Sequence, residues 1–142
     1  MEELKFTDGG DLLELTVEPE KNQKLLSYRD ARVGVRIKSA GFSAQNDVWV
    51  HVDALREFCR RLVALEESRK GVAILRSLSP GELDLSVRSV SGVGAMSVTG
   101  SCAYSVPRPH GAILHRLEFG FEFDPSQLIS AAAIAWVQSY AA

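Results

Sequence analysis

A strict alternation of apolar and polar residues near the C-terminal end of the chain gives way to a helical pattern. The apolar positions of the alternation are Leu117, Phe119, Phe121 and Phe123, and the residues between them are Glu118, Gly120 and Glu122. A period of two is typical of a β-strand with one buried face, and a period near 3.6 is typical of an amphipathic helix. The change of period falls at Asp124 and Pro125, and no charged residue follows it. The pattern therefore predicts a strand, which we expect at the centre of a sheet, followed by a helix over about 125–139.

Two helix N-termini can be placed from the sequence. For the C-terminal helix, we expect Asp124 at the N-cap, Pro125 at the first helical position and Gln127 at the third, in the arrangement of a capping box. A second helix, over about 53–68, is expected to begin at the capping residue Asp53. Its apolar residues follow a spacing of three and four, at Leu55, Phe58, Cys59, Leu62 and Leu65. This pattern predicts an amphipathic helix that lies on a sheet.

The remaining segments are mostly extended. Seven short segments predict strands. They lie at 4–6, 13–17, 33–37, 48–52, 72–75 and 82–90, and from Gly94 to Thr99 or somewhat beyond. Turns are expected at 8–11, at Pro80–Gly81 and at Ser91–Gly92, and loops at 19–30 and 105–111. If the strands at 13–17 and 33–37 pair, Glu14 and Glu18 face the cations Arg32, Arg36 and Lys38.

The order of these elements predicts the fold class. We expect one α+β domain over residues 1–142, with a mostly antiparallel, twisted sheet of about six to eight strands. Two helices, about 53–68 and about 125–139, are expected to pack on this sheet. A hydrophobic fraction of 46% and a charged fraction of 24% are ordinary for a soluble globular domain of this kind.

Charge and hydropathy exclude several classes of partner. A formal net charge of -2, with no basic run longer than two residues, argues against nucleic acid, because binding phosphates needs concentrated positive charge. The N-terminus lacks the pattern of a signal peptide, and the longest nearly apolar run, from Leu128 to Val137, is too short to cross a bilayer. We therefore expect a cytoplasmic protein that does not bind membranes, with Cys59 and Cys102 as free thiols.

Residues with catalytic potential are few and scattered. The three histidines have no spacing typical of a metal site, and Gly92, Gly94 and Gly100 do not match a dinucleotide fingerprint and are more typical of a turn and an edge strand. His115 is in phase with Leu117, which predicts a partly buried side chain. We accordingly predict no catalytic residue, no metal, no cofactor and no enzyme activity. The alternative is a small-ligand or catalytic pocket near His115 and the loop at 107–111.

Four residues are candidates for contact with a partner. Trp49 and His51 alternate with Val48 and Val50, so both are expected on the outer face of their strand, although burial of Trp49 under a neighbouring element is equally compatible with the pattern. Arg108 and His110 lie in the predicted loop, where a plain surface role is the alternative. The uncharged C-terminal end offers a third surface, through which a homodimer or a larger structural oligomer could form.

The order of elements, from the N-terminal hairpin to the segment Leu117–Phe123 and its terminal helix, resembles the WapI-type immunity proteins and their uncharacterised bacterial relatives. The resemblance covers nearly the whole chain and rests on the apolar pattern. It implies a small cytoplasmic, non-enzymatic protein that neutralises a cognate toxin domain by binding it. A neighbouring reading frame for a large secreted protein with a variable C-terminal toxin domain would favour this function.

Overall fold

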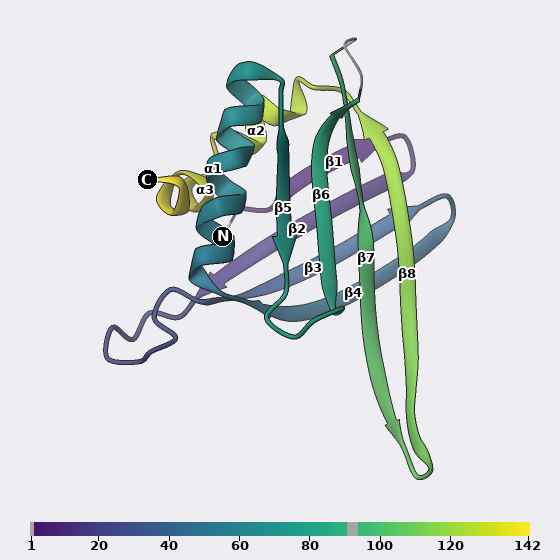
Figure 1. Cartoon of the computed structure of the whole chain (residues 1–142). Helices are drawn as coiled ribbons and strands as arrows, with labels where there is room; N and C mark the ends of the chain where they lie inside the picture. The colour runs from purple at the N-terminus through teal and green to yellow at the C-terminus, as the bar shows by residue number, and fades with distance from the viewer. Residues whose placement is uncertain (1, 91–93) are drawn as a thin grey trace.

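Two antiparallel sheets of four strands, packed face to face, make up most of the protein (Figure 1). The computed structural model describes residues 2–90 and 94–142, so the predicted turn at Ser91–Gly92 lies outside the described residues. The first sheet has the order β1 (Leu4–Asp8), β2 (Asp11–Pro19), β3 (Ala31–Ser39), β4 (Phe42–Val50). The second has the order β5 (Val72–Arg76), β6 (Leu83–Val90), β7 (Ala95–Arg108), β8 (Gly111–Phe123). The α+β class and the antiparallel strands are confirmed, with two sheets in place of one.

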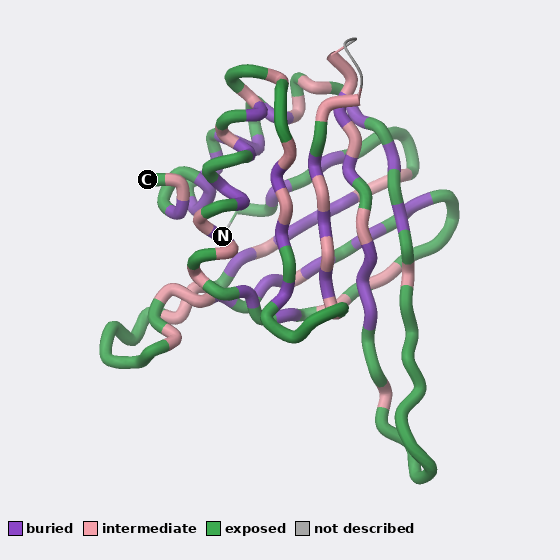
Figure 2. Tube along the Cα trace, in the orientation of Figure 1, coloured by how far each residue is buried: buried purple, intermediate pink, exposed green. Residues whose placement is uncertain are grey.

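The two sheets share one hydrophobic core. Alternate residues of each strand point between the sheets, and Figure 2 shows these buried positions recurring along both sets of strands. Phe6 of β1 stacks on Phe123 of β8, with ring centroids 4.2 Å apart and ring planes inclined by 16°. This contact joins an edge strand of one sheet to an edge strand of the other. Each buried side chain of this size contributes about 1.5–3 kcal/mol through removal from water.

The register of β2 and β3 follows the predicted charge pairs. Glu14 lies opposite Arg36, and their side chains form an ion pair of 3.3 Å between Oε1 and Nη1. Glu18 lies opposite Arg32, but the Arg32 guanidinium pairs with Asp47 of β4 at 3.2 Å. The predicted pairing of β2 with β3 is therefore confirmed. Of the expected cations, Arg36 pairs with a glutamate of β2, whereas Arg32 pairs with an aspartate of β4.

Helix α1 (Val52–Ser68) connects the two sheets and buries the five apolar residues that the sequence predicted. The predicted cap at Asp53 is wrong by two residues. His51 is the N-cap, and its Nδ1 accepts a hydrogen bond of 3.1 Å from the backbone N–H of Asp53. Asp53 lies within the first turn, where a carboxylate interacts favourably with the helix dipole.

The predicted C-terminal helix over 125–139 is two short helices. These are α2 (Gln127–Ala132) and α3 (Ala135–Ala141), separated by Ile134 in an extended conformation with ψ of 136°. The predicted capping box is also wrong, because the Gln127 amide makes two hydrogen bonds of 2.8 Å with the backbone of Thr7 in β1. The Gln127 side chain thus makes a tertiary contact with β1 and does not cap the helix as the local pattern predicted.

Strand β8 lies at the edge of its sheet, which corrects the expectation of a central strand. Its alternation arises because the first sheet covers one face, where Phe119, Phe121 and Phe123 are buried, while Glu118 and Glu122 face solvent. Alternation reports which face of a strand is covered, and it carries no information about hydrogen-bonded neighbours. The glycine at position 100 belongs to β7, between β6 and β8, and so lies in a central strand rather than the expected edge strand.

The predicted loop at 105–111 is also mostly strand. β7 continues to Arg108 and β8 begins at Gly111, which leaves only Pro109 and His110 as the turn. Ala103 directs its backbone groups away from β8, since its N–H donates to the Glu82 carbonyl at 3.0 Å. Pro107, four residues later, has the same orientation, so its missing N–H would point away from β8 and costs the hairpin no hydrogen bond.

Candidate functional site

The far half of the β7–β8 hairpin projects beyond the two sheets (Figure 1). We call residues 103–117 the arm. β6 ends its pairing with β7 at Leu83, opposite Cys102, so the arm consists of two strands only. Its base is held by the N–H of Ala103, which donates to Glu82, and by the Asn46 Nδ2, which donates to the Ala103 carbonyl at 3.0 Å. The arm is thus anchored to β4 and to the segment that precedes β6.

Large apolar side chains of the arm lie in solvent. Tyr104, Ile113 and Leu114 are 53%, 51% and 62% exposed, and Phe42 at the start of β4 is 67% exposed. Figure 2 shows the exposed character of the arm along most of its length. A two-stranded ribbon without a covering layer is only marginally stable in water, so it gains little from apolar residues unless another surface covers them. Clustered exposed apolar residues of this kind mark an interaction surface.

A groove of about 510 Å³ lies between the arm and β4. Its lining includes the apolar residues Phe42, Ala44, Cys102, Ala103, Tyr104, Leu114 and Leu117 and the polar residues Ser43, Gln45, Asn46, His115 and Arg116. His115 is exposed in this groove, which corrects the expectation that it is partly buried. His115 does lie on the same strand face as Leu117, as predicted. The first sheet covers that face only farther along β8, however, and does not cover it at His115.

The four residues predicted to contact a partner fall into two separate groups. Arg108 and His110 lie at the tip of the arm, at the end of β7 and in the turn. Trp49 and His51 lie at the opposite end of β4 from Phe42, where His51 caps α1. Trp49 is 48% exposed, so the alternative in which a neighbouring element buries it does not hold. The structure therefore brings two of the four residues to the arm and places the other two elsewhere.

Sequence patterns did not identify Phe42, Tyr104, Ile113 or Leu114 as surface residues. One signal was present, because Ile113 and Leu114 are adjacent in an extended segment and so point to opposite faces of a strand. A strand with one covered face cannot bury both. The expected loop at 105–111 obscured this signal, since the strand after the loop was expected to alternate only from Leu117 onward.

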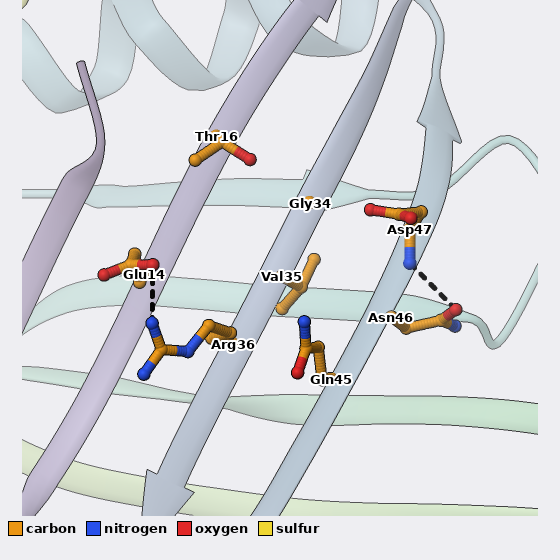
Figure 3. A pocket seen from close by; sticks show the side chains of 8 residues that line it. All are labelled: Glu14, Thr16, Gly34, Val35, Arg36, Gln45, Asn46 and Asp47. Carbon is orange, nitrogen blue, oxygen red and sulfur yellow. Dashed lines mark hydrogen bonds and ion pairs between the residues drawn. The ribbon is translucent and has the colours of Figure 1, made fainter. Parts of the chain in front are cut away.

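A second hollow, of about 320 Å³, lies on the outer face of the first sheet (Figure 3). Gly34 lies in its floor, where an added Cβ would be 2.5 Å from the Thr16 Oγ1. The Glu14 carboxylate, in a residue only 9% exposed, pairs with Arg36 and with Lys5 at 3.5 Å. Within residues 2–90 and 94–142, no buried side-chain nitrogen or oxygen lacks a hydrogen-bond partner. The charges of this hollow are thus already paired, and the arm is the stronger candidate.

The described residues offer little for catalysis or metal binding. No group of three or more histidine, cysteine, aspartate or glutamate side chains among them is placed to hold a metal ion. His51 and His115 lie in different parts of the fold, and Cys59 is fully buried in α1. No helix in the described part of the chain is both long enough and apolar enough to cross a membrane.

Burial of Cys59 has a measurable consequence for stability. Desolvation raises the pKa of its thiol from 9.0 to about 12 in the native protein. The native state therefore keeps this proton over a pH range in which the unfolded chain loses it. Stability is unaffected below about pH 9 and falls as pH rises toward about 12, by about 1.4 kcal/mol per pH unit from this group.

We expect the free energy of unfolding to decline more steeply with pH in the wild type than in Cys59→Ala. Urea denaturation at several pH values between about 8 and 10.5 measures the two slopes. Titration of other groups affects both proteins equally, so the difference isolates Cys59. Parallel slopes would show that the thiol is not desolvated as the structure indicates.

Comparison with known families supports the resemblance given by the order of elements. The model of the immunity protein WapI-like family matches residues 4–135, which is nearly the whole chain. No curated protein and no solved structure matches the chain. The matched range includes both sheets, α1 and the whole arm. The chain therefore belongs to the immunity protein WapI-like family.

Proposed function

We propose that this chain is a non-enzymatic binding protein that neutralises a cognate toxin domain, and that the arm and the groove beside it form the contact surface. The observation that carries this proposal is the exposure of Tyr104, Ile113 and Leu114 on a ribbon that projects from the body. Membership of an immunity protein family supports a toxin domain as the partner. We further propose that the protein acts in the cytoplasm, where its buried cysteines stay reduced.

The shape of the arm suits neutralisation by occlusion. A ribbon two strands wide is narrow enough to enter a cleft, and its hydrogen-bonded backbone limits the entropy lost on binding. The groove beside the arm can receive a side chain of the partner at the same time, between Phe42 and Tyr104. A toxin domain bound in this way would have part of its surface covered without any reaction at the arm.

Backbone groups add a second type of contact. β8 is an edge strand over its whole length, and a partner strand can pair with such an edge. Within the arm, Pro107 lies in β7 and Pro109 lies in the turn, whereas β8 contains no proline. Since proline blocks strand addition, the β8 edge is the open one. Apolar side chains and this open edge therefore belong to the same proposed contact.

Truncation of the exposed arm residues tests the proposal. We expect Tyr104→Ala with Leu114→Ala to weaken binding of the toxin domain by about 30-fold or more, because the loss of one central anchor already costs about 2 kcal/mol. The expected partner is the C-terminal toxin domain of a large secreted protein encoded in a neighbouring reading frame. Isothermal titration calorimetry measures the dissociation constant, and survival of cells that express the toxin domain measures neutralisation.

Ile129→Ala is the matched control, because Ile129 of α2 is 55% exposed and lies outside the arm and the groove. We expect this variant to bind like the wild type. Equal loss of affinity in the control and the arm variant would place the contact elsewhere. Failure of the wild-type protein to bind the toxin domain would contradict the proposed function itself.

A further inference from the structure

The charge of the arm is opposite to that of the body. Residues 103–117 contain the arginines Arg108 and Arg116 and the histidines His110 and His115, and they contain no aspartate or glutamate. The two arginines give the arm a formal charge of +2. Since the net charge of the chain is -2, the rest of the protein carries a charge of -4. A weakly acidic protein thus presents its exposed apolar cluster on a basic projection.

The arginine at the tip of the arm is available to a partner. Among the described residues Arg108 forms no ion pair, and its Nη1 donates only to the carbonyl of the adjacent Pro107, at 3.3 Å. Five arginines of the body do pair with a carboxylate, namely Arg32, Arg36, Arg56, Arg61 and Arg76. The cation at the tip is therefore free, and it differs from the free cations of the body in lying on a segment that contains no carboxylate.

The arginine at the base of the arm has a weak partner. Arg116 pairs with Glu118 at 3.4 Å, and the side chains are 51% and 76% exposed. Exposed pairs of this kind contribute little to stability, so the Arg116 guanidinium can exchange Glu118 for a carboxylate of a partner at small cost. Arg116 also lines the groove that Tyr104 and Leu114 line. Positive charge therefore lies at both ends of the exposed apolar cluster.

We propose that the arm enters an acidic cleft of the partner protein, with Arg108 and Arg116 facing carboxylates and with apolar contacts on both faces of the arm, made by Tyr104 and Ile113 on one face and by Leu114 on the other. This inference rests on the proposed function and specifies the chemistry of the partner. Complementary charge of this kind mainly accelerates association and selects the partner.

Other occupants fit the arm less well. A second copy of this chain, paired arm to arm through the β8 edge, would bring two positively charged arms together, and like charges oppose such a dimer. Nucleic acids and anionic membranes bind through larger sets of cations than two arginines. The mixture of few charges with a large apolar area is typical of a protein interface, where aromatic residues and arginine are enriched.

Charge reversal tests the inference. We expect Arg108→Glu with Arg116→Glu to lower the association rate for the toxin domain about tenfold at low salt, and to reduce the dependence of that rate on salt. The control is Arg60→Glu with Arg88→Glu, since both arginines are exposed, lie on α1 and β6, and give the same net charge of -6. Surface plasmon resonance with the immobilised C-terminal toxin domain measures the rates, and circular dichroism checks the fold.

The outcomes separate this inference from the proposed function. A slower rate in the arm variant alone supports it, and partial recovery in Arg108→Lys with Arg116→Lys strengthens it. Equal binding by the wild type and both variants overturns the acidic surface and leaves the proposed function intact. No binding by the wild type overturns both, and so does tighter binding to single-stranded RNA or to vesicles with anionic lipid at the same ionic strength.

Discussion

Replacement of residues 105–114 by Asn-Gly is expected to abolish binding of the toxin domain while the rest of the protein stays folded. Ala103 directs its backbone groups toward Glu82 and Asn46, so the next pair, Tyr104 and His115, is the hydrogen-bonded pair of the hairpin. A two-residue turn fits between the strands at such a pair. The replacement removes Ile113, Leu114 and Arg108, which lie outside the core.

Stability should change little, because the removed residues are mostly exposed and substitutions away from the core are usually within about 0.5 kcal/mol each. Urea denaturation measures the free energy of unfolding, and calorimetry with the toxin domain measures binding. The comparison that matters is with the full-length arm carrying Tyr104→Ala and Leu114→Ala, in which only side chains are lost. Retained binding by the shortened protein would remove the arm from the contact surface.

Gly100→Ala is expected to destabilise the protein by about 3 kcal/mol, because overpacking typically costs about 1–3 kcal/mol and a clash with backbone atoms lies at the upper end of that range. An added Cβ at Gly100 would lie 2.0 Å from the backbone oxygen of Asp84 and 3.0 Å from the Cα of Leu85. Both atoms belong to β6, so no side-chain rotation can relieve the contact. The strands β6 and β7 would have to separate, and the melting temperature measured by circular dichroism would fall accordingly.

Gly10→Ala is the matched control for this prediction. Gly10 does not have a positive φ, and an added Cβ there would have no atom within 4 Å. Loss of glycine flexibility in the unfolded chain should leave stability unchanged or raise it by about 0.4–1 kcal/mol. If Gly100→Ala were equally well tolerated, β6 and β7 could not be as close at this point as the structure places them.

Most of the strands and α1 could be predicted from sequence because their residues alternate or repeat with one covered face. The three phenylalanines from Phe119 to Phe123 are buried as the pattern indicates, and Leu55 and Leu62 lie on the buried face of α1. Helix ends were less predictable. His51 displaced Asp53 as a cap, and Gln127 bonds to Thr7, which is 120 residues away in the chain.

The candidate site was only partly predictable. Arg108 and His110 were selected as exposed polar residues of a loop, and they do lie at the tip of the arm. Tyr104 and Leu114 were missed, because an apolar residue in a strand is buried or exposed according to whether another layer reaches it. No local pattern contains that information. The net negative charge of the whole chain likewise gave no indication that one projection would carry cations and no carboxylate.

The sequence by itself determined which residues alternate, where helix α1 forms, and which faces must be covered, since these depend on backbone geometry and on the removal of apolar side chains from water. Only the tertiary structure decided that the strands divide into two sheets and that β8 lies at an edge. It also decided that the β7–β8 hairpin extends beyond the sheet that covers the rest of its length. Hydrogen-bond partners and covering layers come from segments far apart in the chain, and for that reason the exposed arm appears only once the fold is known.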